Sequence, residues 1–442
     1  MGLESVGDLA LNIILSKLGP EDTARVSCVS NRFKATASEE CLWSKFYSED
    51  LDLDSPLDPD GNLAPSFKAA YKIWREAFGM YPWHLVKRVK RCWDRLKSWL
   101  TINFPEAKAT LRKGASEEDI QELEEHLKVK LPVPTRILYR FCDGQETLSD
   151  DFESISASSL GLIGGYSFYG HLINVHLLPL SEVILETKEI IHLLSSPGRS
   201  RYILVAFSKT YSEKFFFLNC TNGQLYVGTK NLLLDDEMIP CVPNTLISLG
   251  HRFNSDQQQD AMLLWLEEHG RRLHDGIIKL REEGNIKSIN LFPEEPPLCS
   301  TAITNGVKIR ASALFIPELA DLQHDTEKYC FSYSIRMSLL PEGCIINGMT
   351  FSSCQLQRRH WIIRCNNSVV SDIRAAAVIG MYPFLLPGQE EFVYQSCTPL
   401  PGSPGSVKGS FTFVPGRLTD PKGSQFEVEV AEFPLQRPDY IF

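Results

Sequence analysis

The hydrophobic positions near the N-terminus follow the period of an α-helix. Four apolar residues recur at the spacing of a single helix face: Leu11, Ile14, Leu15 and Leu18. Gly19-Pro20 predicts the end of this helix and the start of a second one, because proline suits the first position of a helix. We expect a small helical unit over roughly the first fifty residues, which is too short to bury much surface alone.

The middle of the chain mixes helical and strand patterns. Ser116 followed by three acidic residues is typical of a helix start, and TRILYRFC predicts a second helix after it. The runs FFFLNC and QLYVG flank the turn Thr221-Asn222-Gly223, which predicts a β-hairpin. QQQDAMLLWLEEHGRRL then has the pattern of a closing helix. An α+β domain is therefore expected here.

After residue 301 the pattern becomes that of β-strands. In YCFSYSIRMSL every second residue from Tyr329 to Leu339 is large and apolar, which predicts a strand with one buried face. QFEVEVAEF repeats this alternation, with Phe426 and Val428 pointing inward. Pro387-Gly388 is typical of a type II turn. Several such strands predict an antiparallel β-sandwich.

Two acidic, proline-rich segments separate these regions, at residues 49–66 and 292–301. Segments of this composition are typical of surface connections. A chain of 442 residues is too long for one hydrophobic core. We therefore expect three domains: an all-α domain over residues 1–82, an α+β domain over residues 83–290 and an all-β domain over residues 296–442.

The charge of the chain narrows the class of partner. A formal net charge of -10 argues against general nucleic-acid binding and favours protein partners. The basic segment 87–100 could form a nucleic-acid patch, but its apolar residues recur at helical spacing, as in an amphipathic helix with a solvated basic face. No run approaches the ~18 to 20 apolar residues of a membrane span, so we expect a cytoplasmic or nuclear protein.

The residues that usually carry chemistry indicate neither a metal nor a catalytic site. The 12 cysteines include no CxxC pair and most lie in apolar runs, which favours buried reduced thiols over disulfides or zinc. The pairs His171/His176 and His269/His274 lack further ligands at a suitable spacing. No serine, histidine and aspartate are grouped as in a catalytic triad. We expect a non-catalytic protein without cofactors.

The segment LNIILSKLGPEDTARVSCVSNRFKATASEECLW, residues 11–43, resembles an F-box in the order of its helix, acidic turn, VSCVSNRF segment and final LW. It departs from the family at Gly7, where a proline is usual. The resemblance implies binding to the Skp adaptor and, through it, to cullin. Six apolar residues are candidates for this contact, although the pattern does not separate them from the core of the module: Leu11, Ile14, Leu15, Leu18, Val26 and Val29.

The middle region resembles the SUKH superfamily over about residues 93–281. The resemblance rests on the acidic helix, the LP-x-P turn, the LYRFCDGQ helix, the LPLSEV segment and the LLWLEEH helix. SUKH domains are α+β modules that act mainly in protein binding, and the resemblance implies the same task here.

Residues 307–435 resemble the ApaG domain through FSYSIRM, QLQRRHWIIR and AAAVIGMYPFLLPGQEEFVYQSCTPLPGSPGSVKGSFTF. The resemblance implies a fibronectin-like sandwich. The GxGxxG motif of that family falls on Ala375, Ala377 and Gly380, and the two alanine methyl groups argue against close approach of a phosphate. Aromatic residues of this domain are either target-binding candidates or core and rim: His360, Trp361, Tyr382, Phe384 and Tyr394.

This order of modules is similar to that of plant Skp-interacting F-box proteins that carry ApaG, and of their animal relatives. The resemblance implies a substrate-recognition subunit of an SCF-type cullin-RING E3 ubiquitin ligase. Such a subunit raises the effective concentration of its target, unidentified here, beside the ubiquitin carrier. Two alternatives stay open: a phosphate- or nucleotide-binding or enzymatic ApaG protein, and an interaction scaffold without a ligase role.

Overall fold

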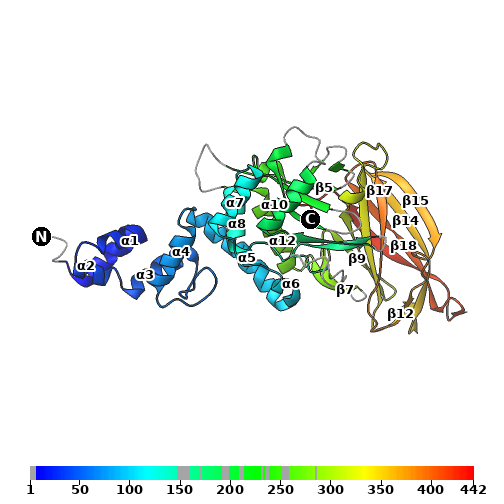
Figure 1. The fold of residues 1–442 in the computed structure, drawn as a ribbon. Coiled ribbons are helices and arrows are strands. Elements are labelled where there is room, and N and C mark those ends of the chain that lie inside the picture. The colour runs from blue at the N-terminus through cyan, green and yellow to red at the C-terminus, as the bar shows by residue number, and fades with distance from the viewer. Residues whose placement is uncertain are drawn as a thin grey trace.

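The computed structural model describes residues 6–146, 159–168, 171–191, 199–208, 214–229, 232–233, 238–249, 258–283 and 286–442. The molecule is elongated: the N-terminal helices project from one end of a larger body, and a β-sandwich forms the other end (Figure 1). The helical, mixed and all-β regions follow one another along the chain in the predicted order.

Four helices make up the N-terminal module. Gly19, at φ 80°, interrupts the first helix directly before Pro20, as the Gly-Pro pair predicts. The indole N–H of Trp43 donates to the carbonyl oxygen of Ala37 at 2.7 Å and so satisfies a buried polar atom of the small core. The helices are α1 (Asp8–Val26), α2 (Asn31–Thr36), α3 (Glu40–Leu51) and α4 (Phe67–Phe78).

The helices of the middle region include the one predicted from its capping residues. The Ser116 hydroxyl accepts from the backbone N–H of Asp119 at 3.1 Å, and the Asp119 carboxylate accepts from the N–H of Ser116 at 2.7 Å. This capping box confirms the predicted start. The helices are α5 (Trp83–Asn103), α6 (Pro105–Ala109), α7 (Glu117–Leu127), α8 (Val133–Phe141), α10 (Leu180–Ile190), α12 (Ala261–His274) and the short η3 (Arg199–Arg201) and η4 (Asn244–Leu246).

These helices pack on an eight-stranded mixed sheet of order β6-β5-β4-β3-β2-β1-β8-β7. The predicted hairpin is its β4-β5 pair, in which Gly223 has a φ of 71°. Only β1 and β8 run parallel among the described pairs. The strands are β1 (Gly164–Phe168), β2 (His171–Leu177), β3 (Tyr202–Ser208), β4 (Lys214–Asn219), β5 (Leu225–Thr229), β6 (Ile239–Pro240), β7 (Lys279–Glu283) and β8 (Ile286–Asn290).

The C-terminal region is the predicted antiparallel sandwich. One sheet has the order β17-β11-β10-β9, and the other has β15 at one edge, followed by β14, β18 and β20. The elements are β9 (Cys299–Thr304), β10 (Val307–Phe315), η6 (Pro317–Leu319), β11 (Tyr329–Leu339), β12 (Cys344–Ile346), β13 (Met349–Phe351), β14 (Cys354–Cys365), β15 (Ser368–Ala376), β16 (Phe384–Leu385), β17 (Phe392–Leu400), β18 (Gly405–Arg417), β19 (Asp420–Pro421) and β20 (Phe426–Leu435).

Strand β11 differs from its prediction. The alternation predicts one buried face, but the polar side of the strand is buried as well, at Ser332, Ser334 and Arg336. The reason is that the middle region lies against the outer side of this sheet, where β1 contacts β17. The two regions therefore form one body. No helix among the described residues is both long and apolar enough to cross a membrane.

Candidate protein-docking surfaces

Helix α1 presents an apolar surface to solvent. Its exposed members, together with one residue of the following turn, are Leu9 (79% exposed), Ile13 (55%), Ile14 (37%), Leu18 (43%) and Val29 (68%). We call these five residues the α1 face. These residues occupy two sides of the helix: Ile14 and Leu18 lie beside the stripe of Leu11 and Leu15, and Leu9 and Ile13 lie opposite it. Large apolar side chains exposed in so small a module are candidates for contact with another protein, because their burial is favourable.

The six adaptor-binding candidates of the sequence divide into two groups in the structure. Leu11 and Leu15 are each 1% exposed and lie in the core of the module, whereas Val26 is half-buried. Ile14, Leu18 and Val29 belong to the α1 face. Any contribution of Leu11 and Leu15 to binding is therefore through the fold of the module.

Leu9 and Ile13 are members of the α1 face that the sequence reasoning missed. They are four residues apart and thus neighbours on the helix surface, on the side away from Leu11 and Leu15. A second apolar pair outside the core-facing stripe is the signal that could have revealed them. Ion pairs border the helix, since Arg32 contacts Asp8 at 2.7 Å.

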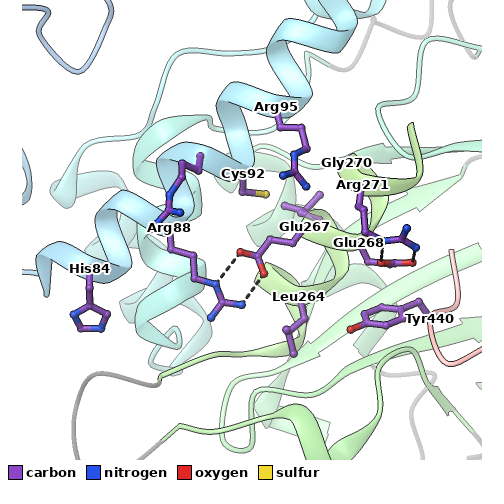
Figure 2. Close-up of a pocket in the computed structure, with 12 residues that line it drawn as sticks. His84, Arg88, Cys92, Arg95, Leu264, Glu267, Glu268, Gly270, Arg271 and Tyr440 are labelled. Carbon is purple, nitrogen blue, oxygen red and sulfur yellow. Dashed lines mark hydrogen bonds and ion pairs between the residues drawn. The ribbon is translucent and has the colours of Figure 1, made fainter. Parts of the chain in front are cut away.

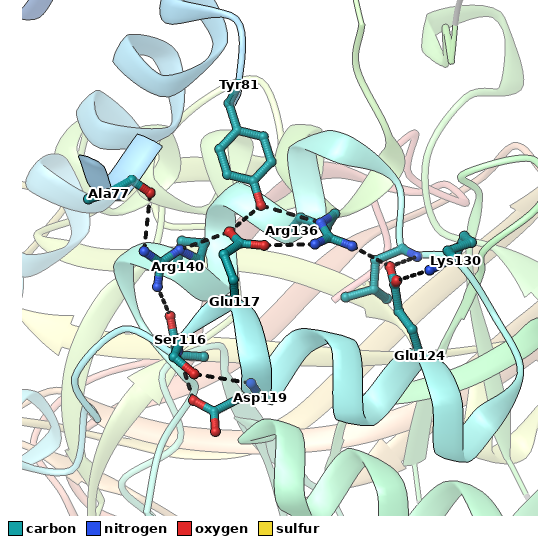
Figure 3. A network of polar contacts seen from close by, with 11 residues as sticks. Ala77, Tyr81, Ser116, Glu117, Asp119, Glu124, Lys130, Arg136 and Arg140 are labelled. Carbon is teal, nitrogen blue, oxygen red and sulfur yellow. Dashed lines mark hydrogen bonds and ion pairs between the residues drawn. The ribbon is translucent and has the colours of Figure 1, made fainter. Parts of the chain in front are cut away.

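A polar network joins the N-terminal module to the middle region (Figure 3). Glu117 is its centre: its carboxylate accepts from the Tyr81 hydroxyl at 2.5 Å and from Arg136 at 2.7 Å, and it contacts Arg140 at 3.1 Å. Arg136 also reaches Glu124 at 2.6 Å, and Arg140 donates to the carbonyl oxygen of Ala77 at 3.2 Å. These bonds fix the direction in which the module projects.

Burial and charged neighbours shift the pKa values of two groups in this network, Tyr81 and Glu124. Burial raises the pKa of Tyr81 to about 12, so its hydroxyl stays a donor at neutral pH. Burial alone would raise the pKa of the Glu124 carboxyl, but Lys130, the backbone N–H of Leu131 and Arg136 together hold that pKa below its usual range. Glu124 is therefore an anion that keeps Arg136 in place.

Apolar packing supports the same junction. Phe78 of α4 stacks on Phe141 of α8 with ring centroids 4.7 Å apart, and Trp74 lies 6.0 Å from the same ring. Stacked aromatic pairs contribute beyond the area that they bury. Helix α4 is thus packed on the middle region as well as on α3.

The five aromatic candidates of the C-terminal region do not form one groove. Trp361 and Tyr394 are 2% and 3% exposed and belong to the sandwich core. His360 lies on the outer side of β14, where its Nε2 is 2.8 Å from Asp372 Oδ1. Tyr382 is 44% exposed, and the ring of Phe384 is covered by the Arg417 guanidinium at 4.1 Å. Tyr382 is the most accessible of the five.

The loop that matches the glycine motif has an unusual backbone. Ala377 has a φ of 62°, and Ile379 and Gly380 have φ values of 43° and 79°. Ala377 is buried, and its carbonyl oxygen accepts from Arg359 at 2.6 Å. The loop backbone therefore binds a basic side chain of strand β14, and the Ala377 methyl group stands where the family has glycine.

A groove of about 560 Å³ lies between α5 and α12 (Figure 2). Arg88 binds both carboxylate oxygens of Glu267, at 2.7 and 2.6 Å, and Arg271 binds Glu268 at 2.8 Å. Arg91 and Arg95 also line it, and neither has an acidic partner among the described residues. The groove thus keeps an excess of positive charge in an acidic protein.

A buried polar cluster closes the contact between the middle and C-terminal regions. The Tyr166 hydroxyl bonds to both carboxylate oxygens of Glu318, at 2.8 and 2.7 Å. Lys214 donates to the carbonyl oxygen of Phe442 at 2.5 Å and to Tyr166 at 3.1 Å. The Phe442 ring stacks on Trp265 at 5.5 Å. The last residues of the chain therefore pack into the middle region.

No cluster of three or more histidine, cysteine, aspartate or glutamate residues arranged for a metal occurs in the part of the chain that the structure describes. All cysteines that it describes are free thiols. The described surfaces with distinctive chemistry are the α1 face, the groove of Arg91 and Arg95, and the exposed side of the sandwich.

Comparison with known proteins identifies relatives of these regions. The model of the F-box domain matches residues 5–45, and the model of the ApaG domain matches residues 320–415. The chain is 61% identical to F-box protein SKIP16 of Arabidopsis thaliana over 100% of both chains. It is 24% identical to F-box only protein 3 of Homo sapiens, over 99% of this chain and 84% of that one. Protein ApaG of Nitrosomonas europaea is 33% identical over 30% of this chain and 91% of its own length.

Proposed function

The chain belongs to the family of F-box proteins with a C-terminal ApaG domain, and from this premise we propose that it is the substrate-recognition subunit of an SCF-type ubiquitin ligase. The α1 face carries the proposal. An F-box whose core residues Leu11 and Leu15 are buried, but which still exposes five large apolar side chains, lacks the partner that would cover them. We propose the Skp adaptor as that partner, with cullin recruited through it.

The target is held, in this proposal, by the body formed by the middle and C-terminal regions. Residues 1–82 would serve docking, whereas residues 83–290, as a SUKH-like domain, and residues 296–442 would serve recognition. The shared polar cluster of Lys214, Glu318 and Tyr166 supports treating both recognition domains as one unit. The chain would contribute no catalytic group and would act by raising the effective concentration of the target near the ubiquitin carrier.

Pull-down of the adaptor and cullin by two variants of the full chain tests this function. Ile13→Asp places a charge at one of the exposed apolar positions of α1, and we expect adaptor binding to weaken at least 30-fold, or about 2 kcal/mol. Ile102→Asp is the matched control, because Ile102 is 80% exposed on α5 and outside that face. Retention of adaptor and cullin by a folded Ile13→Asp protein would contradict the proposal.

A further inference from the structure

Strand β15 is an unprotected edge of the outer sheet of the sandwich. It pairs with β14 on one side only, and none of its backbone N–H groups has another partner in the part of the chain that the structure describes. Seven of its nine residues are exposed, including Val369, Val370 and Ile373 at 56%, 45% and 39%. The edge thus offers both free hydrogen-bonding groups and apolar side chains.

Exposed edge strands are usually blunted, because they pair with the edges of other chains. Proline, a covering loop and a row of like charges are common ways to prevent such pairing. Strand β15 has no proline and no like-charge pair: its charged residues are one acid, Asp372, and one base, Arg374. Because Asp372 and Arg374 carry opposite charges, this strand does not repel a second copy of itself.

The sequence of β15 is complementary to itself in one antiparallel register. When Ile373 lies on a two-fold axis, Asp372 of each copy stands directly opposite Arg374 of the other, and the two ion pairs lie on the same face of the joined sheet. Val370 then stands opposite the small Ala376. Directly opposed side chains in antiparallel strands are close enough to interact, and opposite charges there stabilise the pair.

We infer that β15 is a homodimer interface at which the outer sheets of two copies join edge to edge. Figure 1 shows β15 at the end of the molecule remote from the N-terminal helices, so a second copy there leaves the α1 face free. The interface is isologous, since the same residues meet from both sides. The inference does not depend on adaptor binding and holds whether or not the chain acts in a ligase.

The dimer is expected to be weak. A single pair of strands buries less than the roughly 1,200 Å² at which standard-size interfaces begin. We therefore expect a micromolar dissociation constant, with sedimentation equilibrium of the full chain giving a mass that rises with concentration from 49.9 kDa toward twice that value. A mass that stays at 49.9 kDa up to the solubility limit would overturn the inference.

Charge reversal at the edge tests the register directly. Asp372→Arg alone places arginine opposite Arg374, and Arg374→Asp alone places aspartate opposite Asp372, so two repulsive pairs replace two attractive ones. We expect each variant to dimerise roughly 30-fold more weakly than the natural chain. Arg358→Asp is the control, because Arg358 is exposed on the inner strand β14 and its reversal should leave dimerisation unchanged.

A mixture of the two single variants shows whether each of them fails to dimerise because it is misfolded or because its charges no longer match. In a heterodimer of Asp372→Arg with Arg374→Asp, each opposed pair again joins an arginine to an aspartate. We expect the mixture to sediment as a dimer although each variant alone is monomeric, and the double variant Asp372→Arg/Arg374→Asp to dimerise with itself. Failure of both restorations, or dimerisation of the natural chain that no variant changes, would overturn the register.

Discussion

At the scale of single residues, adjacent apolar side chains of α1 have different tasks. Leu15 is 1% exposed and completes the core of the F-box, whereas Ile14 beside it is 37% exposed and belongs to the α1 face. A helix turns by about 100° at each residue, so neighbours in the sequence point in different directions. Loss of adaptor binding is informative about contact only for the exposed positions.

Replacing Leu15 by alanine should therefore act on stability before it acts on binding. We expect Leu15→Ala to lower the free energy of unfolding of the module by ~2 to 5 kcal/mol, because a fully buried leucine is truncated. Ile14→Ala should cost less than about 1 kcal/mol. Amide hydrogen exchange of α1 to α3 measures both, and equal loss of protection in the two variants would show that this division of α1 is incorrect.

His269 is a second residue whose burial has a measurable consequence. It is 0% exposed, its Nε2 is 2.9 Å from the carbonyl oxygen of Leu162, and its Nδ1 has no partner among the described residues. Burial lowers the pKa of His269 from 6.5 to about 4, and Arg272 also disfavours the cation. The folded chain therefore holds this imidazole neutral under conditions in which an exposed one is protonated.

This pKa predicts a loss of stability in mild acid. Between pH 6.5 and about 4 the unfolded chain binds a proton at His269 that the folded chain does not, so the stabilisation is complete above pH 6.5 and falls as the pH falls. The full loss is about 3 kcal/mol. Urea unfolding across this range should show a flatter pH dependence for His269→Gln than for the natural chain. A variant with the same pH dependence as the natural chain would contradict this prediction.

At the scale of elements, local pattern was sufficient wherever neighbours in the sequence determine the structure. The capping box of Ser116, the Gly19 break and the β4-β5 hairpin were all predicted, because each depends on a few adjacent residues. The second buried face of β11 and the centre of the network at Glu117 were not, since distant segments create both. The sequence likewise identified α1 without separating its core from its exposed face.

The Glu117 network should hold the docking module more firmly than an ordinary surface ion pair does. Glu117, Arg136 and Arg140 are 15 to 19% exposed at their side chains, between the surface and the interior. We expect Glu117→Gln to lower the free energy of unfolding by about 1 to 3 kcal/mol, because two guanidinium groups lose their charged partner.

Glu118→Gln is the control for that change. Glu118 follows Glu117 in α7, is exposed and is not among the labelled residues of the network in Figure 3, so its neutralisation should leave thermal unfolding nearly unchanged. If Glu117→Gln and Glu118→Gln have the same midpoint of unfolding, the network does not stabilise the junction.

At the scale of the whole molecule, the junction near residue 82 determines how the chain can be divided. A fragment of residues 67–442 keeps α4 and the stack of Phe78 on Phe141, whereas a fragment of residues 83–442 exposes Phe141. We expect the longer fragment to unfold at the higher temperature and to resist proteolysis better. Both should lose the adaptor and keep the target. Equal stability of the two fragments would show that α4 belongs to the docking module alone.

The packing of residues 438–442 into the middle region has a consequence for folding during synthesis, because these residues are made after all the others in this sequence. Trp265 donates to the carbonyl oxygen of Ile441, a residue 176 positions later. At a synthesis rate of about 5 to 20 residues per second, the ribosome needs roughly 10 to 35 s to add that stretch. During that time the nascent middle region lacks Phe442, whose ring stacks on Trp265 in the folded chain. The newly made chain should therefore need chaperone protection longer than its domain order suggests.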